Sequence, residues 1–311
     1  MVNQAAPKVT VVGSLNVDLV CRASRRPDTG ETLIGEAFDI FTGGKGFNQA
    51  TAAARLGANV TLIGSLGADL FGDMLLTATE NERINNRFVT KRTEVGTGVA
   101  TIVIEPDGDN SIIVVPRANM ALTTTDIDAA ADDIANAEVL LLQLETPIAA
   151  SEHAAAIAKA HGTTVILNPA PAQPLPDSLL ASVDILTPNQ SETELLSGVK
   201  VDNHEDARRA AGVLRDRMAD APSTAVVLTL GAQGALMLTA TESEHVSALT
   251  VDAVDTTGAG DAFCGALATA LASGETLPTA VEFANTAGAA AVTVVGATPS
   301  MPTRAKIARL T

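Results

Sequence analysis

The sequence contains no tryptophan or tyrosine, and only seven of its 311 residues are phenylalanine. A site that recognises a nucleobase by aromatic stacking is therefore disfavoured, since such sites are built from these rings. The two cysteines, Cys21 and Cys264, are too few for a disulfide framework. No charged and then apolar leader with a cleavage site opens the chain, so we expect a cytoplasmic protein.

Basic residues are also scarce: 20 Lys and Arg stand against 36 Asp and Glu, a net charge of −16. This charge repels nucleic acid and anionic membrane surfaces, and we expect neither as a partner. Hydrophobic residues make up 46% of the chain, yet no uninterrupted apolar run approaches the roughly 18 residues of a membrane-spanning helix. A small neutral ligand, or an anion at a special local site, is favoured.

Short Val/Ile/Leu runs alternate with Ala-rich stretches of helical spacing along the whole chain. The runs are VTVVGSL, VTLIGSL, VLLLQL, TVILNP, VDILTP and AVVLTL. Near-continuous apolar strands separated by helices are typical of a mostly parallel sheet that is covered on both faces. We therefore predict a doubly wound α/β fold, with residues 1–311 as one domain.

Two segments, 14–40 and 95–118, break this alternation because they offer strand-like residues and turns without a covering helix. The stretch TGVATIVIEPDGDNSIIVVPRAN predicts a hairpin that turns at Pro106–Asp109. Together the two segments predict a small β-sheet lid over the main domain. Two separate surface excursions are the alternative.

Polar residues follow the buried runs, at the edge of a parallel sheet where ligands bind. They are Gln143, Glu145, Asn168, Asn189, Thr229 and Gly231. In the first strand of the chain, Asn16 and Asp18 alternate with Leu15 and Val17 and so share one face. An amide beside a carboxylate can take two adjacent hydroxyls, although ordinary solvent-facing residues explain the pair equally well.

The stretch TGGKGFNQATAAARLG, residues 42–57, combines glycines with Lys45 and with Asn48 near the start of an Ala-rich helix. Gly43, Gly44 and Gly46 permit backbone to lie close to a ligand. The spacing does not match a P-loop, and the GxGxxG dinucleotide fingerprint is absent from the sequence. A helix start that is built from glycines for structural reasons alone is the alternative.

A second glycine-rich stretch, DTTGAGDAF at 255–263, leads into the helical pattern AFCGALATALASG. Gly258, Ala259 and Gly260 open this helix, and free N–H groups at a helix start attract an anion such as a transferring γ-phosphoryl group. Asp261 is placed to accept a proton from a hydroxyl that attacks this anion. Helix capping is the simpler alternative for Asp261.

With these two stretches, the chain resembles the ribokinase-like, or PfkB-type, carbohydrate kinases. The resemblance rests on GGKGFNQA at 43–50 and DTTGAGDAF at 255–263, with QLETP, LNPAPAQPLPD, DILTPNQSETE and TLGAQG between them and VGATPSMP near the end. It implies a ribokinase-like fold and transfer of the γ-phosphoryl group of ATP to the primary 5-hydroxyl of D-ribose. It also implies a lid that closes over the sugar and commonly forms a homodimer interface.

The resemblance implies roles for particular residues. Asp261 is the catalytic base, and the anion hole is formed by Gly258, Ala259 and Gly260. Besides Asp261, the sugar contacts are Asn16, Asp18, Gly44, Lys45, Asn48 and Glu145. The nucleotide contacts are Gly260, Thr229, Gly231, Gly234, Asn285 and the pair Asn189 and Glu192, which acts on Mg²⁺ and the phosphates through water. An activating monovalent cation, usually K⁺, is held by Asp255, Thr257, Val292, Val295, Gly296 and Ser300.

Two departures from the family pattern bear on the sugar rather than on the reaction. Phe47 stands where a small residue is common, and Arg117 replaces a glycine of the lid loop. Deoxyribose, fructose or a nucleoside are therefore alternative acceptors. A sugar-sensing protein without turnover is a further alternative, which the intact Asp261 disfavours. A nicotinamide oxidoreductase would share the sheet type but lacks its fingerprint.

Overall fold

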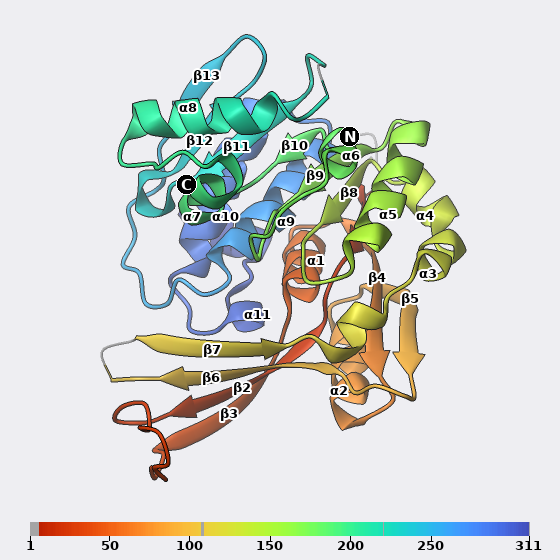
Figure 1. The fold of residues 1–311 in the computed structure, drawn as a ribbon. Helices are drawn as coiled ribbons and strands as arrows, with labels where there is room; N and C mark the ends of the chain where they lie inside the picture. The colour runs from red at the N-terminus through yellow and green to blue at the C-terminus, as the bar shows by residue number, and fades with distance from the viewer. Residues whose placement is uncertain (1–5, 107–108, 220, 311) are drawn as a thin grey trace.

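The computed structural model describes residues 6–106, 109–219 and 221–310. Over these ranges, the centre of the molecule is a nine-stranded sheet of order β13-β12-β11-β10-β9-β8-β1-β4-β5 (Figure 1). The parallel strands are β1 (Lys8–Val12), β4 (Asn59–Gly67), β5 (Asn85–Arg92), β8 (Val139–Leu142), β9 (Thr164–Leu167), β10 (Ile185–Leu186) and β11 (Ala225–Thr229). An antiparallel edge follows, formed by β12 (Ala235–Leu238) and β13 (Ser243–Val246).

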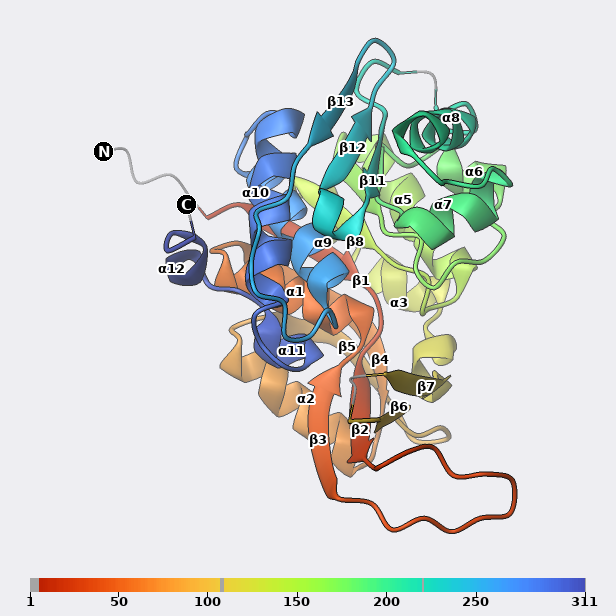
Figure 2. The same cartoon turned by 90° about the vertical axis from the view of Figure 1, so that its left-hand side faces the viewer.

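Helices cover both faces of this sheet (Figure 2). One face carries α1 (Lys45–Arg55), α2 (Leu70–Asn81), α9 (Ala259–Ala272) and α10 (Leu277–Ala291). The other carries α3 (Thr124–Ala129), α4 (Ala131–Ala135), α5 (Ile148–His161), α6 (Asp177–Leu180), α7 (Gln190–Ser197) and α8 (His204–Arg215). Short helical turns complete the fold: η1 (Arg117–Ala121), η2 (Gly231–Gln233), α11 (Ala297–Ser300) and α12 (Arg304–Ile307). The predicted doubly wound α/β fold is confirmed.

The strands are apolar without interruption because each side of the sheet has its own hydrophobic core. Along β8, Leu141 belongs to the core under α1, α9 and α10, whereas Leu140 and Leu142 belong to the core under α5. All three side chains are fully buried. Alternate residues of a strand point to opposite faces, so a strand covered on both sides needs apolar residues at every position.

Helices α1 and α9 lie unusually close together. A Cβ on Gly265 of α9 would stand 2.6 Å from the Gln49 carbonyl oxygen of α1 and 2.6 Å from Ala52 Cβ. Only glycine therefore permits this approach. It brings the first turns of α1 and α9, which carry the two glycine-rich stretches, to the same place.

A second sheet of order β3-β2-β6-β7 stands apart from the main one in the described part of the chain (Figure 1). Its strands are β2 (Asn16–Arg22), β3 (Ala37–Gly43), β6 (Gly98–Ile104) and β7 (Asn110–Val115). The two segments that break the alternation thus form one sheet, as predicted, with β2 and β6 paired in parallel at its centre. Of the predicted hairpin turn, residues 107 and 108 lie outside the described residues.

One strand assignment is wrong. Asn16 and Asp18 share β2, as their alternation predicts, but β2 is the second strand of the chain and not the first. Strand β1 of the main sheet ends at Val12, and β2 of the small sheet begins at Asn16. Leu15 between them is fully buried, so hydrophobicity continues through the break and hides it in the sequence.

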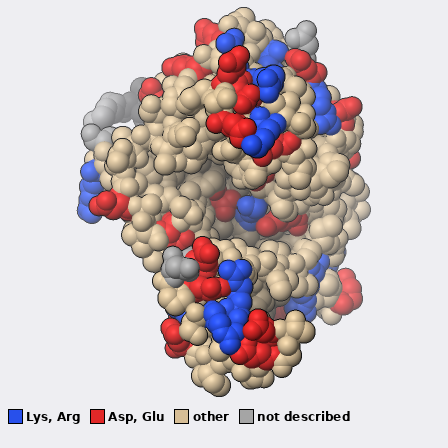
Figure 3. All heavy atoms as spheres, turned by 60° about the vertical axis from the view of Figure 1, so that its left-hand side comes forward, with Lys and Arg blue, Asp and Glu red and all other residues tan. Residues whose placement is uncertain are grey.

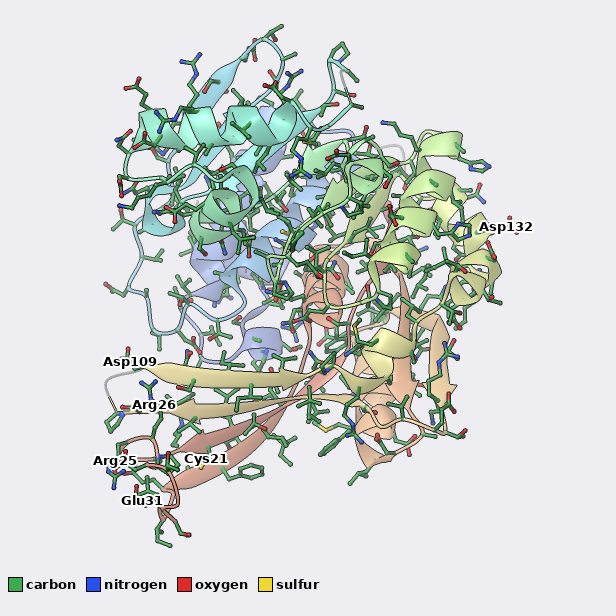
Figure 4. All side chains as sticks on the ribbon, viewed as in Figure 1. Cys21, Arg25, Arg26, Glu31, Asp109 and Asp132 are labelled. Carbon is green, nitrogen blue, oxygen red and sulfur yellow. The ribbon has the colours of Figure 1, made fainter. Side chains whose placement is uncertain are left out.

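The far end of the small sheet is polar. Figure 4 shows Arg25, Arg26 and Glu31 gathered there, in the connection between β2 and β3. Arg25 Nη1 lies 2.6 Å from Glu31 Oε2, and Arg26 pairs with Glu105 at the end of β6. Exposed pairs of this kind shape a loop but contribute little to stability.

None of the helices in the described ranges combines the length and the apolar character needed to cross a bilayer.

Candidate active site

The site lies where the carboxyl ends of the main-sheet strands face the small sheet. Figure 3 shows the molecule hollowed between these two parts, with both basic and acidic side chains at the base of the hollow. The polar residues expected at the strand ends meet here: Gln143 follows β8, Asn168 follows β9, and Asn189 bridges to Thr229 at the end of β11. The first turns of α1 and α9 complete the site.

Asp261 is the buried centre of this arrangement. It lies in the first turn of α9 with 7% of its surface exposed. Its Oδ2 accepts a hydrogen bond from Asn48 Nδ2 at 2.9 Å, and its Oδ1 accepts one from Gln49 Nε2 at 2.9 Å. Burial raises the pKa of Asp261, while Lys45 and the two amide donors oppose this rise. A carboxylate held in this way is oriented and available as a proton acceptor.

The backbone at the start of α9 is open to a ligand. Gly258 precedes the helix in the left-handed conformation, with φ 78°. The Ala259 N–H is bonded to the Thr256 carbonyl at 3.2 Å, so it is satisfied locally. A Cβ on Gly260 would meet no atom within 4 Å. The open part of the expected anion hole therefore begins at Gly260, beside Asp261, where the helix dipole favours negative charge.

Glu145 is held by two segments that carry residues expected at the sugar. The Ser14 hydroxyl donates to Glu145 Oε2, and the Lys45 backbone N–H donates to the same oxygen at 3.1 Å. Burial lowers the pKa of Lys45, but the charges of Asp261, Glu145 and Glu192 outweigh it and raise that pKa above its usual value. The Lys45 ammonium is therefore the positive charge around which these carboxylates are arranged.

Asp18 adds a further carboxyl to the same side. Burial raises its pKa to about 7, and the negative charges of Glu145 and Asp261 add to the rise. Gly43 lies against it: a Cβ there would stand 2.3 Å from Asp18 Oδ2. A Cβ on Gly46 would overlap the backbone of Gly13 and Ser14, so this glycine permits a close contact within the chain rather than with a ligand.

Asn16 is fixed by Asn119, a fully buried residue of η1. Asn119 Nδ2 donates to Asn16 Oδ1 at 2.7 Å, and Asn119 also bonds the backbone N–H and carbonyl of Leu15 at 2.9 and 3.1 Å. A side chain at Gly98 would overlap both amides, since its Cβ would lie 2.2 Å from Asn16 Oδ1. Because its oxygen is occupied, Asn16 presents its amide N–H groups as donors.

A separate pocket of about 310 Å³ lies on the other side of the α9 N-terminus. Of the residues expected at the nucleotide, it is lined by Thr229, Gly231, Gly234, Gly260 and Asn285. Leu249, Val251 and Phe263 give it apolar walls. A flat apolar ring system with a polar tail toward Gly260 would fit this lining.

Asn189 and Glu192 do not line that pocket but form the capping box of α7. Glu192 N–H donates to Asn189 Oδ1 at 2.8 Å, and Asn189 N–H donates to Glu192 Oε2 at 2.8 Å. Burial raises the pKa of Glu192, while the Asn189 N–H and Lys45 oppose the rise. The Glu192 carboxylate is therefore held in place near Lys45 and Asp261. Asn189 Oδ1 and Glu192 Oε2 are already engaged in the capping box.

The residues expected at a monovalent cation are brought together. Asp255 accepts hydrogen bonds from the backbone N–H groups of Thr257 and Gly296 at 2.9 and 2.8 Å. Burial raises the pKa of Asp255, but the Thr257 side chain and these backbone bonds outweigh it and hold that pKa below its usual value. The Val292 carbonyl accepts from the Asp255 N–H at 3.1 Å. Ser300 Oγ lies 3.5 Å from the Thr257 carbonyl, whereas Val295 is 46% exposed. Asp255 thus ties the loop before α9 to the loop after α10.

The two departures from the family pattern occupy different surroundings. Phe47 is fully buried in the core beneath α1, among Leu15, Val17 and Leu66, so its ring serves packing. Arg117 adopts a left-handed conformation with φ 45°, which favours glycine. Its guanidinium lies over Gly96, and its Nη1 donates to the Thr97 carbonyl at 3.1 Å.

Several residues of the site were not among the predicted contacts. Ser14 holds Glu145, Gln49 holds Asp261, and Asn119 holds Asn16. Thr298 Oγ1 lies 2.6 Å from both Asn48 Oδ1 and the Thr42 carbonyl. Gln49 adjoins the predicted contact Asn48 and Ser14 lies two residues before the predicted contact Asn16, so proximity in the sequence was the only available signal. Asn119 and Thr298 belong to PRAN and VGATPSMP, two stretches noted for other residues.

No cluster of three or more His, Cys, Asp or Glu side chains suited to a metal ion occurs within residues 6–106, 109–219 and 221–310. A buried carboxylate at an open helix start, between a group of polar side chains and a second pocket, is an arrangement that suits phosphoryl transfer.

Comparison with known proteins gives the family. The pattern of the pfkB family of carbohydrate kinases matches residues 6–304. The chain belongs to this family, and the predicted carbohydrate kinase activity class is confirmed.

Among similar proteins, the ribokinase of Haemophilus influenzae is 41% identical over 296 residues, which is 95% of each chain. The deoxyribokinase of Salmonella typhi is 40% identical over 261 residues, or 84% of each chain. The solved structure of Arabidopsis thaliana ribokinase, complexed with ribose and ATP, matches with a TM-score of 0.91 at 33% identity and covers 98% of both chains.

The raised pKa of Asp18 predicts a pH-dependent stability. The folded state holds the Asp18 proton up to a pKa of about 7, against 3.8 in the unfolded chain. Folding stability is therefore lost as pH rises from about 4 to 7. We expect Asp18→Asn to be more stable than the parent above this window, by at most ~4 kcal/mol at ~1.4 kcal/mol per pKa unit.

Urea unfolding between pH 4 and pH 9 measures this difference. Asp132→Asn is the matched control, because Asp132 is an exposed residue that points away from the site (Figure 4). Parallel stability curves for Asp18→Asn and the parent would contradict the assignment.

Proposed function

We propose that this protein transfers the γ-phosphoryl group of ATP to the primary 5-hydroxyl of D-ribose, giving D-ribose 5-phosphate and ADP. The observation that carries the proposal is the position of Asp261, at the open start of α9 between two ligand sides. On one side are Asn16, Asp18 and Glu145, and on the other is the pocket lined by Thr229 and Asn285. Relatives named ribokinase at about 40% identity support ribose as the acceptor.

The sugar side suits a polyol. Asn16 presents donors because Asn119 occupies its oxygen, and the carboxyls of Asp18 and Glu145 accept from hydroxyls. Asn48 is held between Asp261 and Thr298, so its amide is oriented beside the base. These groups would align the 5-hydroxyl with the Asp261 carboxylate.

The chemical step then follows from the geometry. The 5-hydroxyl oxygen forms a bond to the γ-phosphorus while the bond from that phosphorus to the β–γ bridging oxygen breaks, and ADP leaves with the electron pair. The hydroxyl proton passes to Asp261. Charge on the transferring group is stabilised at the start of α9, from Gly260 onward, and by Lys45.

Two metal ions complete the proposal. Asn189 and Glu192 already bond each other, so they fit Mg²⁺ held by the nucleotide phosphates and reached through water rather than direct ligation. Bound Mg²⁺ would supply positive charge to the phosphates. The oxygen atoms of Asp255, Thr257, Val292 and Ser300 lie near one another and fit a hard monovalent cation such as K⁺. Val295 and Gly296 adjoin these oxygen atoms and would complete the cation site.

The small sheet is proposed as both lid and dimer interface. It exposes large apolar residues in the monomer, an unusual surface for a protein that remains alone in water. They are Ile34, Phe38, Ile40, Ile112, Ile113, Val114 and Val115. One face would close over the sugar, and the other would pair with a second copy. ATP as co-substrate and the free thiols of Cys21 and Cys264 fit a cytoplasmic location.

Deoxyribose is the second candidate acceptor, favoured by the similarity to a protein named deoxyribokinase. A coupled ADP-release assay over ribose, deoxyribose, fructose and a nucleoside decides between them, with K⁺ present and with K⁺ replaced by Na⁺. We expect the highest kcat/KM for ribose with K⁺. A clear preference for another acceptor would overturn the choice of sugar, and saturable sugar binding without ADP release would establish a sensor instead.

Replacing the base separates binding from turnover. We expect Asp261→Asn to lower kcat by about 10² to 10⁴, the usual effect of removing a general base. Sugar binding should persist, because the amide keeps the shape of the side chain and calorimetry can measure it directly. Turnover equal to that of the parent would show that Asp261 is not the base.

The dimer is tested by sedimentation velocity at micromolar concentration. We expect the parent to sediment as a dimer and Ile113→Lys to sediment as a monomer, since Ile113 is 68% exposed in the monomer and a buried unpaired ammonium disrupts an apolar interface. Leu70→Lys is the control, since Leu70 is 81% exposed outside the small sheet. A monomeric parent would refute the interface.

A further inference from the structure

A chain of buried carboxamides ends on the Asp261 carboxylate. Gln49, one residue after Asn48 in α1, is fully buried. Its Nε2 lies 2.9 Å from Asp261 Oδ1 and 3.1 Å from Asn168 Oδ1. Its Oε1 accepts from Gln143 Nε2 at 2.7 Å. Gln49 therefore has every polar atom engaged, and its strongest acceptor is the catalytic carboxylate.

The orientation of the Gln49 amide is set by its neighbours. Asn168 Nδ2 donates to the Thr187 carbonyl at 3.0 Å, which turns the Asn168 oxygen toward Gln49 and requires the Gln49 nitrogen there, beside Asp261. The Gln49 oxygen then accepts from Gln143 Nε2, whose own oxygen has no partner among the described residues. A reversed Gln49 would place its oxygen against a carboxylate and its nitrogen against another amide nitrogen, and both contacts are repulsive.

We propose that Gln49, oriented by Asn168, is a positioning residue that holds the Asp261 carboxylate in its reactive orientation and favours its ionised state. The proposal rests on the proposed role of Asp261 as the base. Gln49 touches neither sugar-side group Asn16 nor Glu145 through any hydrogen bond of the described residues. Its contribution is therefore to turnover rather than to sugar binding.

The charged surroundings make such a donor necessary. Lys45 is the positive group that faces Asp261. Glu145, Asp18 on β2 and Glu192 on α7 are negative neighbours, and the Cys264 thiol lies one turn along α9 with its pKa raised by burial to about 12. Burial and the acidic neighbours raise the pKa of Asp261, while Lys45, Gln49 and Asn48 lower it. Asn48 Nδ2 donates to the other carboxylate oxygen, Oδ2, so it does not replace a missing Gln49 at Oδ1.

The test compares pH profiles of kcat for the parent and Gln49→Met, which keeps the length of the side chain and removes the donor. A hydrogen bond to a charged group is worth about 1.5–3 kcal/mol, or roughly one to two pH units. We expect the acid limb of the profile to move to higher pH by about one unit or more, with kcat recovering toward the parent at high pH. The KM for the sugar should stay within about threefold.

Two further variants separate this role from a structural one. Thr51→Val is the matched control, because Thr51 is also fully buried in α1 and its hydroxyl has no partner in the described structure. Its profile should superimpose on that of the parent. Gln143→Met leaves Gln49 in place but removes the donor to its oxygen, so the acid limb should move in the same direction by a smaller amount. This variant also keeps the proposal testable if Gln49→Met does not fold.

A direct readout distinguishes this proposal from the proposed function. The ¹³C-carboxyl resonance of Asp261 in aspartate-labelled protein, assigned by its loss in Asp261→Asn, reports protonation whether or not the protein turns over. A higher titration midpoint in Gln49→Met supports the inference even for an inactive parent. Unchanged midpoints and profiles in both glutamine variants, or an equal loss of kcat at every pH with raised KM, would overturn it.

Discussion

The rest of the site depends on one constraint, the burial of the Asp261 carboxylate at the start of α9. A buried carboxylate is unfavourable unless hydrogen bonds and opposite charge compensate for lost water. Here the compensation comes almost entirely from one helix: Lys45, Asn48 and Gln49 all lie in the first turns of α1. That helix reaches Asp261 because Gly265 lets the two backbones meet.

The segment that joins the main sheet to the small sheet also carries residues of the site. The chain leaves the main sheet at Val12 and, within four residues, supplies Ser14 to Glu145 and Asn16 to the sugar side. Asn119 of η1 clamps this crossing through three hydrogen bonds. The orientation of the sugar-side groups and the attachment of the small sheet therefore depend on the same contacts. Movement of that sheet would be felt directly at Asn16.

Prediction from the sequence succeeded where a local pattern has a single physical meaning. Uninterrupted apolar runs require a sheet covered on both faces, and polar residues after such runs require a common edge, so the meeting of Gln143, Asn168 and Asn189 was predictable. It placed residues 14–40 in the small sheet, but it wrongly took Asn16 and Asp18 as part of the first strand, which ends at Val12. Leu15 is buried at the junction of two sheets and looks no different from a residue inside one strand.

The residues that orient the contacts were beyond the reach of pattern. Gln49, Asn119 and Thr298 act through partners 94 to 256 positions away in the chain, as for Gln49 with Gln143 and Thr298 with Thr42. No spacing rule connects such positions. By itself the sequence determined the fold class, the two glycine-rich helix starts and the presence of a carboxylate beside one of them, since these follow from local periodicity and backbone freedom. Only the tertiary structure decided which amide faces which oxygen, because hydrogen-bond direction is set by distant groups brought together in the folded chain.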